Sequence, residues 1–140
     1  MEFLPKPKEV KLLMGEHALC YDGRIVLEGR LLGNGDTYAK VLQQGIQKET
    51  GMQYEMGYGV PGRKETGAIV LGLDETLKSQ QYILQVTEEN ITIQGGDGAG
   101  VLYGVQTLCQ MIHEYGALLP AVRIEDEPDL PVRGYYLDET

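Results

Sequence analysis

Residues 82–124, YILQVTEENITIQGGDGAGVLYGVQTLCQMIHEYGALLPAVRI, decide the fold class. The stretch opens with two short runs, 82–87 and 91–94, joined by three polar residues. Apolar and polar residues alternate in the second run, which is typical of a half-buried strand. The short polar connection predicts that the two strands form an antiparallel hairpin.

A helix and a further strand complete this stretch. Apolar residues recur at helical spacing from Val101 to Ile112. Asp97 or Gly98 marks the predicted start of the helix, and Gly116 marks its end. Residues 119–124 form another apolar run. The order strand, strand, helix, strand predicts an α+β domain.

Upstream, the segment 37–50 has a single apolar stripe and predicts the first helix, with Asp36 as its N-cap and Gly51 just past its end. The continuous apolar run 67–73 suits a central strand that is buried on both faces. Between them, the glycine-rich segment 51–66 is interpreted as a loop that can contain a short strand.

Two strands are expected near the start, at 10–14 and 24–27. The Asp22-Gly23 turn signal between them favours their pairing with each other. The proline-punctuated segment that begins at Glu125 is interpreted as an acidic linker.

Composition excludes several classes of partner. A chain of 140 residues makes one ordinary domain, and its net charge of −9 repels phosphate, so nucleic acid is not expected as a partner. No apolar run approaches the length of a membrane helix, and no membrane partner is expected. The N-terminal residues lack the pattern of a signal peptide, which predicts a cytoplasmic protein. Secretion is the alternative, because an engineered N-terminus would have lost a signal peptide.

The glycine run 95–100 stands where a dinucleotide fingerprint would, between a strand and a helix. No register of it gives G-x-G-x-x-G, and Asp97 would place a negative charge beside a bound phosphate. We interpret the run as a tight turn that lets the helix approach the sheet, and we expect no cofactor.

Other reactive residues also favour structural roles. His17 and His113 are expected to be solvated or locally hydrogen-bonded, because no metal-binding spacing surrounds them. Ser79 lacks a nucleophile motif, and Cys109 lies on the apolar stripe of the second helix. Cys20 and Cys109 are interpreted as reduced thiols. The sequence therefore predicts no catalytic, cofactor-binding or metal-binding residue.

Two other classes of function remain open on the residues alone. A self-contained carbohydrate- or protein-binding module would use exposed aromatic side chains, and the candidates are Tyr54, Tyr58 and Tyr115. A nucleotide-binding enzyme would use the glycine run 95–100, although the run lacks G-x-G-x-x-G spacing and contains the negative charge of Asp97.

A set of ordered motifs resembles a known family. These are the two strands 82–87 and 91–95, the helix motif 99–108 (AGVLYGVQTL), the segment 119–128 (LPAVRIEDEP) and the strand 133–138 (RGYYLD). Together they are similar to the non-catalytic N-terminal domain of glycoside hydrolase family 20, the β-N-acetylhexosaminidases. Equivalent domains of O-GlcNAcase-like and α-glucuronidase enzymes are the nearest alternatives.

The resemblance implies a mixed, largely antiparallel sheet with two helices packed on one face. It implies a domain at 1–126, followed at 127–140 by a linker and the first strand of a (β/α)₈ catalytic barrel, with Asp138 near the catalytic face. Glu139 and Thr140 depart from the usual continuation of the family and indicate a divergent branch.

The resemblance also implies a function for the longer protein. Such enzymes remove terminal N-acetylhexosamine with retention, using the acetamido group of the substrate as nucleophile. The expected partners are the chain's own C-terminal catalytic barrel and, for the parent enzyme, a glycan substrate. Contact with the barrel is expected at a set of apolar side chains: Val122, Ile124, Leu130, Val132 and Tyr135.

Overall fold

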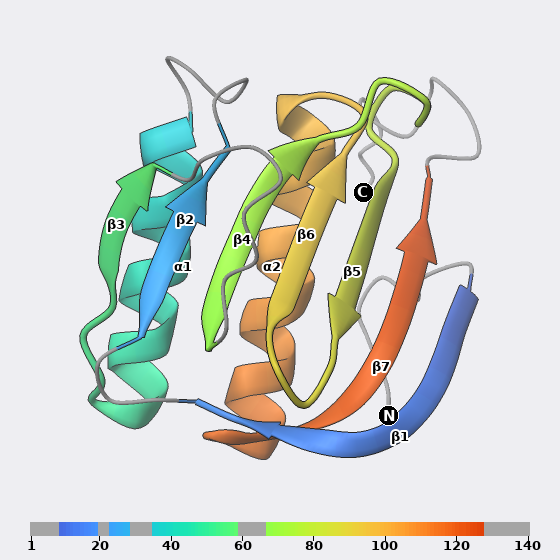
Figure 1. Cartoon of the computed structure of the whole chain (residues 1–140). Helices are drawn as coiled ribbons and strands as arrows, with labels where there is room; N and C mark the ends of the chain where they lie inside the picture. The colour runs from blue at the N-terminus through green and yellow to red at the C-terminus, as the bar shows by residue number, and fades with distance from the viewer. Residues whose placement is uncertain (1–8, 20–22, 29–34, 59–66, 128–140) are drawn as a thin grey trace, which may run out of the picture.

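The computed structural model describes residues 9–19, 23–28, 35–58 and 67–127. It contains seven strands in one sheet and two helices that cover one face of that sheet (Figure 1). The strands are β1 (Glu9–Ala18), β2 (Arg24–Leu27), β3 (Glu55–Tyr58), β4 (Ala68–Leu73), β5 (Tyr82–Val86), β6 (Ile91–Gly95) and β7 (Leu118–Asp126), and the helices are α1 (Gly35–Thr50) and α2 (Gly98–Tyr115).

The strand order is β1-β7-β5-β6-β4-β2-β3. The pairs β1–β7, β7–β5 and β5–β6 are antiparallel, whereas β6–β4, β4–β2 and β2–β3 are parallel. The predicted α+β domain with a mixed sheet and two helices on one face is confirmed. Its sheet has a larger parallel share than "largely antiparallel" implies, because α1 carries the chain from β2 to a parallel β3.

The core lies between the sheet and the helices, and the strand register builds it. Two rows of apolar side chains run across the sheet through paired positions. Each fully buried member stabilises the fold by roughly 1.5–3 kcal/mol. The rows are Ile25, Ile69, Ile91, Val86, Val122 and Leu12, and Leu27, Leu71, Ile93, Leu84, Ile124 and Val10. Only their ends on β1 are exposed, Leu12 by 69% and Val10 by 39%.

Most predicted elements agree with the structure. The β5–β6 hairpin, the interior position of β4, the short strand β3 and both helices are confirmed. Gly51 ends α1 with a φ of +78°, and its N–H donates to the carbonyl of Gln47 at 2.9 Å. Helix α1 begins at Gly35, so Asp36 lies inside its first turn and the predicted N-cap position was wrong.

The predicted pairing of the first two strands was also wrong. β1 pairs with β7, and β2 lies between β3 and β4, with four strands between it and β1 in the sheet. A turn signal reports a local reversal of the chain, whereas the partner of a strand is set by long-range burial. The predicted strand 133–137 lies outside the described residues.

Candidate functional site

The outer side of α2 carries no charge over most of the helix. From Gly98 to Ile112 it contains no Asp, Glu, Lys, Arg or His. A helix that meets water on its outer side normally has charged residues there, whereas a helix without them is typically covered on both sides. Helix α1 shows the ordinary pattern, with exposed Lys40 and Lys48. The outer side of α2 is therefore suited to contact with another layer of protein.

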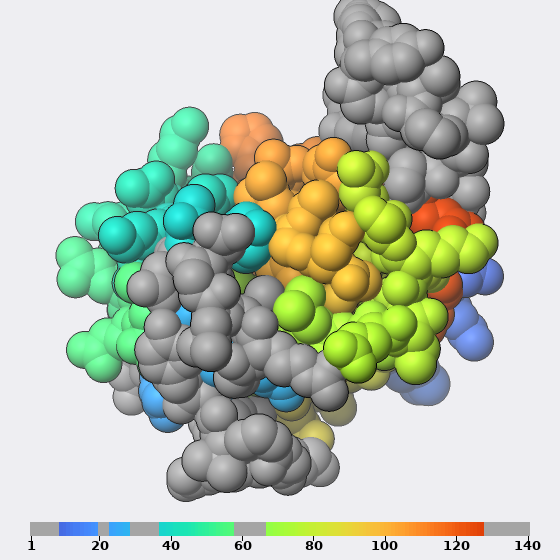
Figure 2. Space-filling view, turned by 90° about the horizontal axis from the view of Figure 1, so that it is seen from above, coloured from blue at the N-terminus to red at the C-terminus, as the bar shows by residue number. Residues whose placement is uncertain are grey.

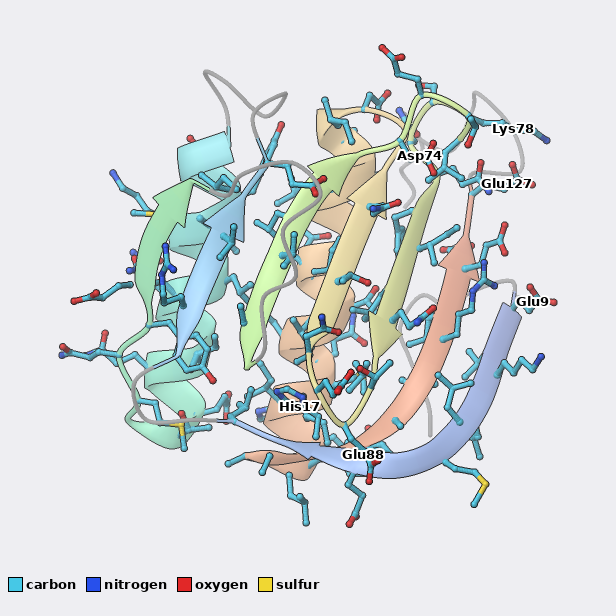
Figure 3. The ribbon with its side chains drawn as sticks, viewed as in Figure 1. Glu9, His17, Asp74, Lys78, Glu88 and Glu127 are labelled. Carbon is cyan, nitrogen blue, oxygen red and sulfur yellow. The ribbon has the colours of Figure 1, made fainter. Side chains whose placement is uncertain are left out.

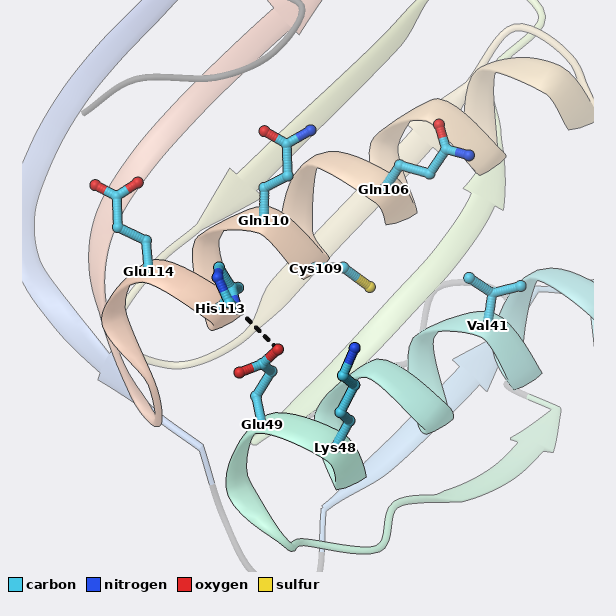
Figure 4. A pocket seen from close by; sticks show the side chains of 8 residues that line it. All are labelled: Val41, Lys48, Glu49, Gln106, Cys109, Gln110, His113 and Glu114. Carbon is cyan, nitrogen blue, oxygen red and sulfur yellow. Dashed lines mark hydrogen bonds and ion pairs between the residues drawn. The ribbon is translucent and has the colours of Figure 1, made fainter.

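A groove of about 970 Å³ lies between the outer sides of α1 and α2 (Figure 4). Its apolar part includes Val41 on α1, and its α2 side begins with the exposed amide of Gln106. Charged groups gather toward the C-terminal ends of both helices. The lining residues are Val41, Lys48, Glu49, Gln106, Cys109, Gln110, His113 and Glu114.

One ion pair links the two helices across this groove. Nδ1 of His113 lies 2.9 Å from Oε2 of Glu49, and the side chains are 76% and 24% exposed. His113 is thus largely exposed, as predicted for a solvated histidine, and its hydrogen-bond partner is 64 residues away in the chain. So exposed a pair contributes little stability, about 0–1 kcal/mol, and it remains available to a partner.

Cys109 is half-buried against the core and cannot serve as a ready nucleophile. Burial, and then the nearby negative charge of Glu49, raises the pKa of its thiol to about 11. Only the thiolate form attacks electrophiles, and this form is scarce at neutral pH. The interpretation of Cys109 as a packing residue is therefore supported.

The glycine run forms a tight turn, as predicted. The Asp97 side chain within the run occupies the N-terminal end of helix α2. Asp97 is the N-cap of α2 and accepts hydrogen bonds from the Gly100 and Gln80 N–H groups and from the Ser79 hydroxyl, at 2.9, 3.0 and 2.8 Å. Partial burial by itself raises the pKa of Asp97, but these bonds and one from Ala99 N–H outweigh it and hold the pKa below its ordinary value. A bound phosphate would meet this carboxylate, so the nucleotide-binding alternative loses support.

Two sets of predicted contact residues lie elsewhere than expected. Val122 and Ile124 are fully buried in the core beneath the helices, so the prediction that they contact a catalytic barrel was wrong. Their apolar character serves the domain's own core. Tyr54 is 1% exposed and cannot stack on a sugar, whereas Tyr115 is 37% exposed. The side chains of Tyr58, Leu130, Val132 and Tyr135 lie outside the described residues.

His17 is buried and its hydrogen-bond partner is 70 residues away, so the prediction of a solvated or locally hydrogen-bonded histidine was wrong for this residue. Its Nδ1 lies 2.9 Å from the carbonyl oxygen of Thr87, so it fastens β1 to the β5–β6 turn, and Nε2 has no hydrogen-bond partner among the described residues. Burial of a polar atom without a partner costs stability, and this atom is the exception among the described side chains.

The acidic segment at the end of β7 lines a small hollow of about 250 Å³ with Glu9. Its carboxylates are engaged with protein groups: Glu125 with Gln81 and Arg123, and Glu127 with Lys78. Within the described ranges, no His, Cys, Asp and Glu side chains group as metal ligands. Asp129, the next acidic residue after Glu127 in the sequence, lies outside the described residues.

Sequence reasoning missed the groove, although a signal for it was present. The absence of charge from 98 to 112 can be read from the sequence. That an uncharged side faces outward, beside Val41 of α1, requires knowing which side of α2 packs on the sheet.

Comparison with known proteins identifies relatives along the whole described chain. Residues 1–127 match the family model described as glycosyl hydrolase family 20, domain 2. The chain is 38% identical over 82 residues to a beta-hexosaminidase of Vibrio vulnificus, which covers 59% of this chain and 9% of that protein. It is 27% identical over 140 residues to a beta-hexosaminidase of Vibrio furnissii, covering 99% of this chain and 21% of that protein. The chain thus spans about a fifth or less of these relatives.

Solved structures share the fold. A mutant beta-hexosaminidase of Streptomyces plicatus, solved with its product GlcNAc, superimposes with a TM-score of 0.75 at 22% identity over 91% of this chain and 26% of that one. An exo-β-N-acetylglucosaminidase of Vibrio harveyi gives a TM-score of 0.70 at 18% identity, over 89% of this chain and 19% of that one. Among the described residues, no helix is long and apolar enough to cross a membrane.

Proposed function

Because this chain belongs to the family described as glycosyl hydrolase family 20, domain 2, we propose that it is the non-catalytic accessory domain of a longer glycoside hydrolase. The longer enzyme removes terminal N-acetylhexosamine with retention, by substrate-assisted catalysis. The names of the relatives, beta-hexosaminidases several times longer than this chain, support this proposal. The division at residue 126 into accessory domain and linker is part of the proposal.

The uncharged outer side of α2 is the observation that carries the proposal. The cores of protein interfaces are depleted of charged residues. The opposite face of the sheet has a different character, because Arg24, Lys11 and Glu9 are exposed there. We therefore place the contact with the catalytic domain of the same polypeptide on the helical side, over the groove between α1 and α2.

The groove residues divide into two roles in this contact. Val41 and the half-buried Cys109 supply the apolar centre. Lys48 and the His113–Glu49 pair supply a polar rim at the C-terminal ends of the helices. Rim charges orient a partner more than they strengthen its binding.

The experiment compares this 140-residue chain with the longer protein that contains it. The chain alone is expected to leave an aryl N-acetylglucosaminide intact, and the longer protein is expected to release the aryl group. Hydrolysis by the purified 140-residue chain would overturn the accessory role.

A second experiment tests the surface. Gln106→Glu places a charge in the groove, and Gln44→Glu makes the same change on the exposed side of α1 outside it. Gln106→Glu is expected to lower the thermal stability of the longer protein more than that of the isolated chain, whereas Gln44→Glu affects both equally. Equal effects of the two variants on the longer protein would exclude this surface.

A further inference from the structure

The end of β7, where the chain leaves the domain, pairs with β5 at Tyr82↔Asp126 and with β1 at Glu9↔Glu125, and the loop Asp74–Gln81 adds side-chain contacts to it. Gln81 Nε2 donates to Oε2 of Glu125 at 3.0 Å, and Lys78 Nζ lies 3.2 Å from Oε2 of Glu127. Figure 3 shows Lys78 and Glu127 side by side beyond the end of β7. Asp126, which stands between Glu125 and Glu127 in the chain, is 6% exposed. Its Oδ1 accepts the N–H of Glu127 at 2.9 Å.

Gln81 is built to connect two segments rather than to fill space. Its Oε1 accepts the N–H of Lys78 at 2.7 Å while its Nε2 reaches Glu125. Both ends of the amide are therefore used, and the side chain is 8% exposed. A buried amide with both ends satisfied is oriented by its partners, so it fixes the loop and the strand relative to one another.

The loop itself is anchored on the start of α2, beside which it packs (Figure 2). The carboxylate of Asp97 holds Ser79 and Gln80, and Gly96 N–H donates to the Gln81 carbonyl at 2.9 Å. Gln80 has a φ of +65°, which is uncommon for a residue other than glycine and persists only where its surroundings require it. The loop thus transmits the position of α2 to the end of β7.

We propose that the loop Asp74–Gln81 fixes the direction in which the chain leaves β7 and so orients the domain that follows, with Gln81 as the positioning residue. The existence of that following domain rests on the proposed function. The fixing of residues 125–127 does not, because every contact that produces it lies within this chain.

The first test is made on the 140-residue chain. Gln81→Leu keeps most of the side-chain volume and removes both hydrogen bonds. Gln94→Leu is the matched control, because Gln94 is a half-buried glutamine on β6, which does not pair with β7. The backbone order parameter of the Glu127 amide, which follows the last paired residue of β7, is expected to fall from about 0.85 to below about 0.6 in Gln81→Leu and to stay unchanged in Gln94→Leu, whereas the ladder-paired Glu125 keeps its value in both.

A second variant keeps the test decisive if Gln81→Leu unfolds. Lys78 is 76% exposed, so Lys78→Ala removes its ion pair without disturbing the core. It is expected to lower the order parameter of Glu127 but not that of Leu84 in the core. A rigid Glu127 amide in both variants would overturn the proposal, and so would an equal loss of order at Leu84, which indicates general destabilisation.

The second test is made on the longer protein by small-angle X-ray scattering. Gln81→Leu is expected to increase the radius of gyration relative to Gln94→Leu, because the following domain then samples more orientations. An unchanged radius of gyration together with a mobile Glu127 would overturn the orienting role. Absence of hexosaminidase activity in the longer protein would instead count against the proposed function and leave the scattering comparison intact.

Discussion

Gly104 on α2 lies so close to Ile93 on β6 that a Cβ added to it would stand 2.5 Å from Cγ2 of Ile93. The next neighbours of that Cβ would be ring atoms of Tyr82, at 3.3 and 3.5 Å. This close approach requires a residue without a Cβ where α2 crosses the β5–β6 hairpin.

We therefore expect Gly104→Ala to lower the free energy of unfolding by about 1–3 kcal/mol, because overpacking a core costs that much. The gain in helix propensity, up to about 1 kcal/mol, does not compensate. Urea unfolding measures the change. The exposed control Gln106→Ala is expected to stay within about 0.5 kcal/mol of the parent. A Gly104→Ala protein as stable as the parent would show that α2 does not sit this close.

Removal of the N-cap side chain of Asp97 tests the tight turn at the start of α2. Asp97→Ala is expected to lower the free energy of unfolding by about 0.5–2 kcal/mol at neutral pH. Because folding lowers the pKa of Asp97 below its ordinary value of 3.8, its contribution is present above about pH 4 and is lost as the pH falls through the folded value. Denaturant unfolding at pH 7 and pH 3 should therefore show a larger difference between parent and variant at pH 7 than at pH 3.

Alkylation of Cys109 tests its environment. A pKa of about 11 in place of 9.0 makes the thiolate about 100-fold scarcer at neutral pH. In a Cys20→Ser background, modification by iodoacetamide at pH 7.5, followed by mass spectrometry, is expected to be about 100-fold slower in the native state than in urea. Glu49→Gln removes the charge that contributes to the raised pKa and should accelerate the native reaction. Equal native and unfolded rates would contradict the burial of this thiol.

Titration with sugars separates the accessory role from a carbohydrate-binding module. Of the described tyrosine candidates, only Tyr115, at the end of α2, is exposed. Tyr54 is buried and adds no second aromatic ring on which a sugar could stack. N-acetylglucosamine and chito-oligosaccharides are expected to leave the NMR shifts of Tyr115 unchanged. Saturable shifts there would favour the binding module.

Local patterns predicted the elements of this fold well, because helices, hairpins and caps depend on neighbouring residues. Three local signals identify features of the structure. The periodicity of 101–112 identifies helix α2, the alternation of 91–94 identifies strand β6, and Gly51 identifies the end of α1. The family resemblance supplied the mixed sheet and its covering helices.

Pairing over long distances could not be predicted in the same way. Nothing near β1 indicates that Val10 and Leu12 extend rows of side chains that begin on β2. Val122 and Ile124 were assigned to an interface for a related reason, since an apolar residue has the same pattern whether its own core or a partner buries it. The groove depends on both helices at once, and His17 depends on a turn 70 residues away.

The pairing of β1 with β7 also dictates when the domain can be completed. Paired residues such as Leu12 and Val122 are more than a hundred positions apart in the chain. At about 5–20 residues per second on the ribosome, the first strand waits several seconds or longer for its partner to be synthesised. The sheet therefore gains the edge strand β1 only after β7 has been synthesised.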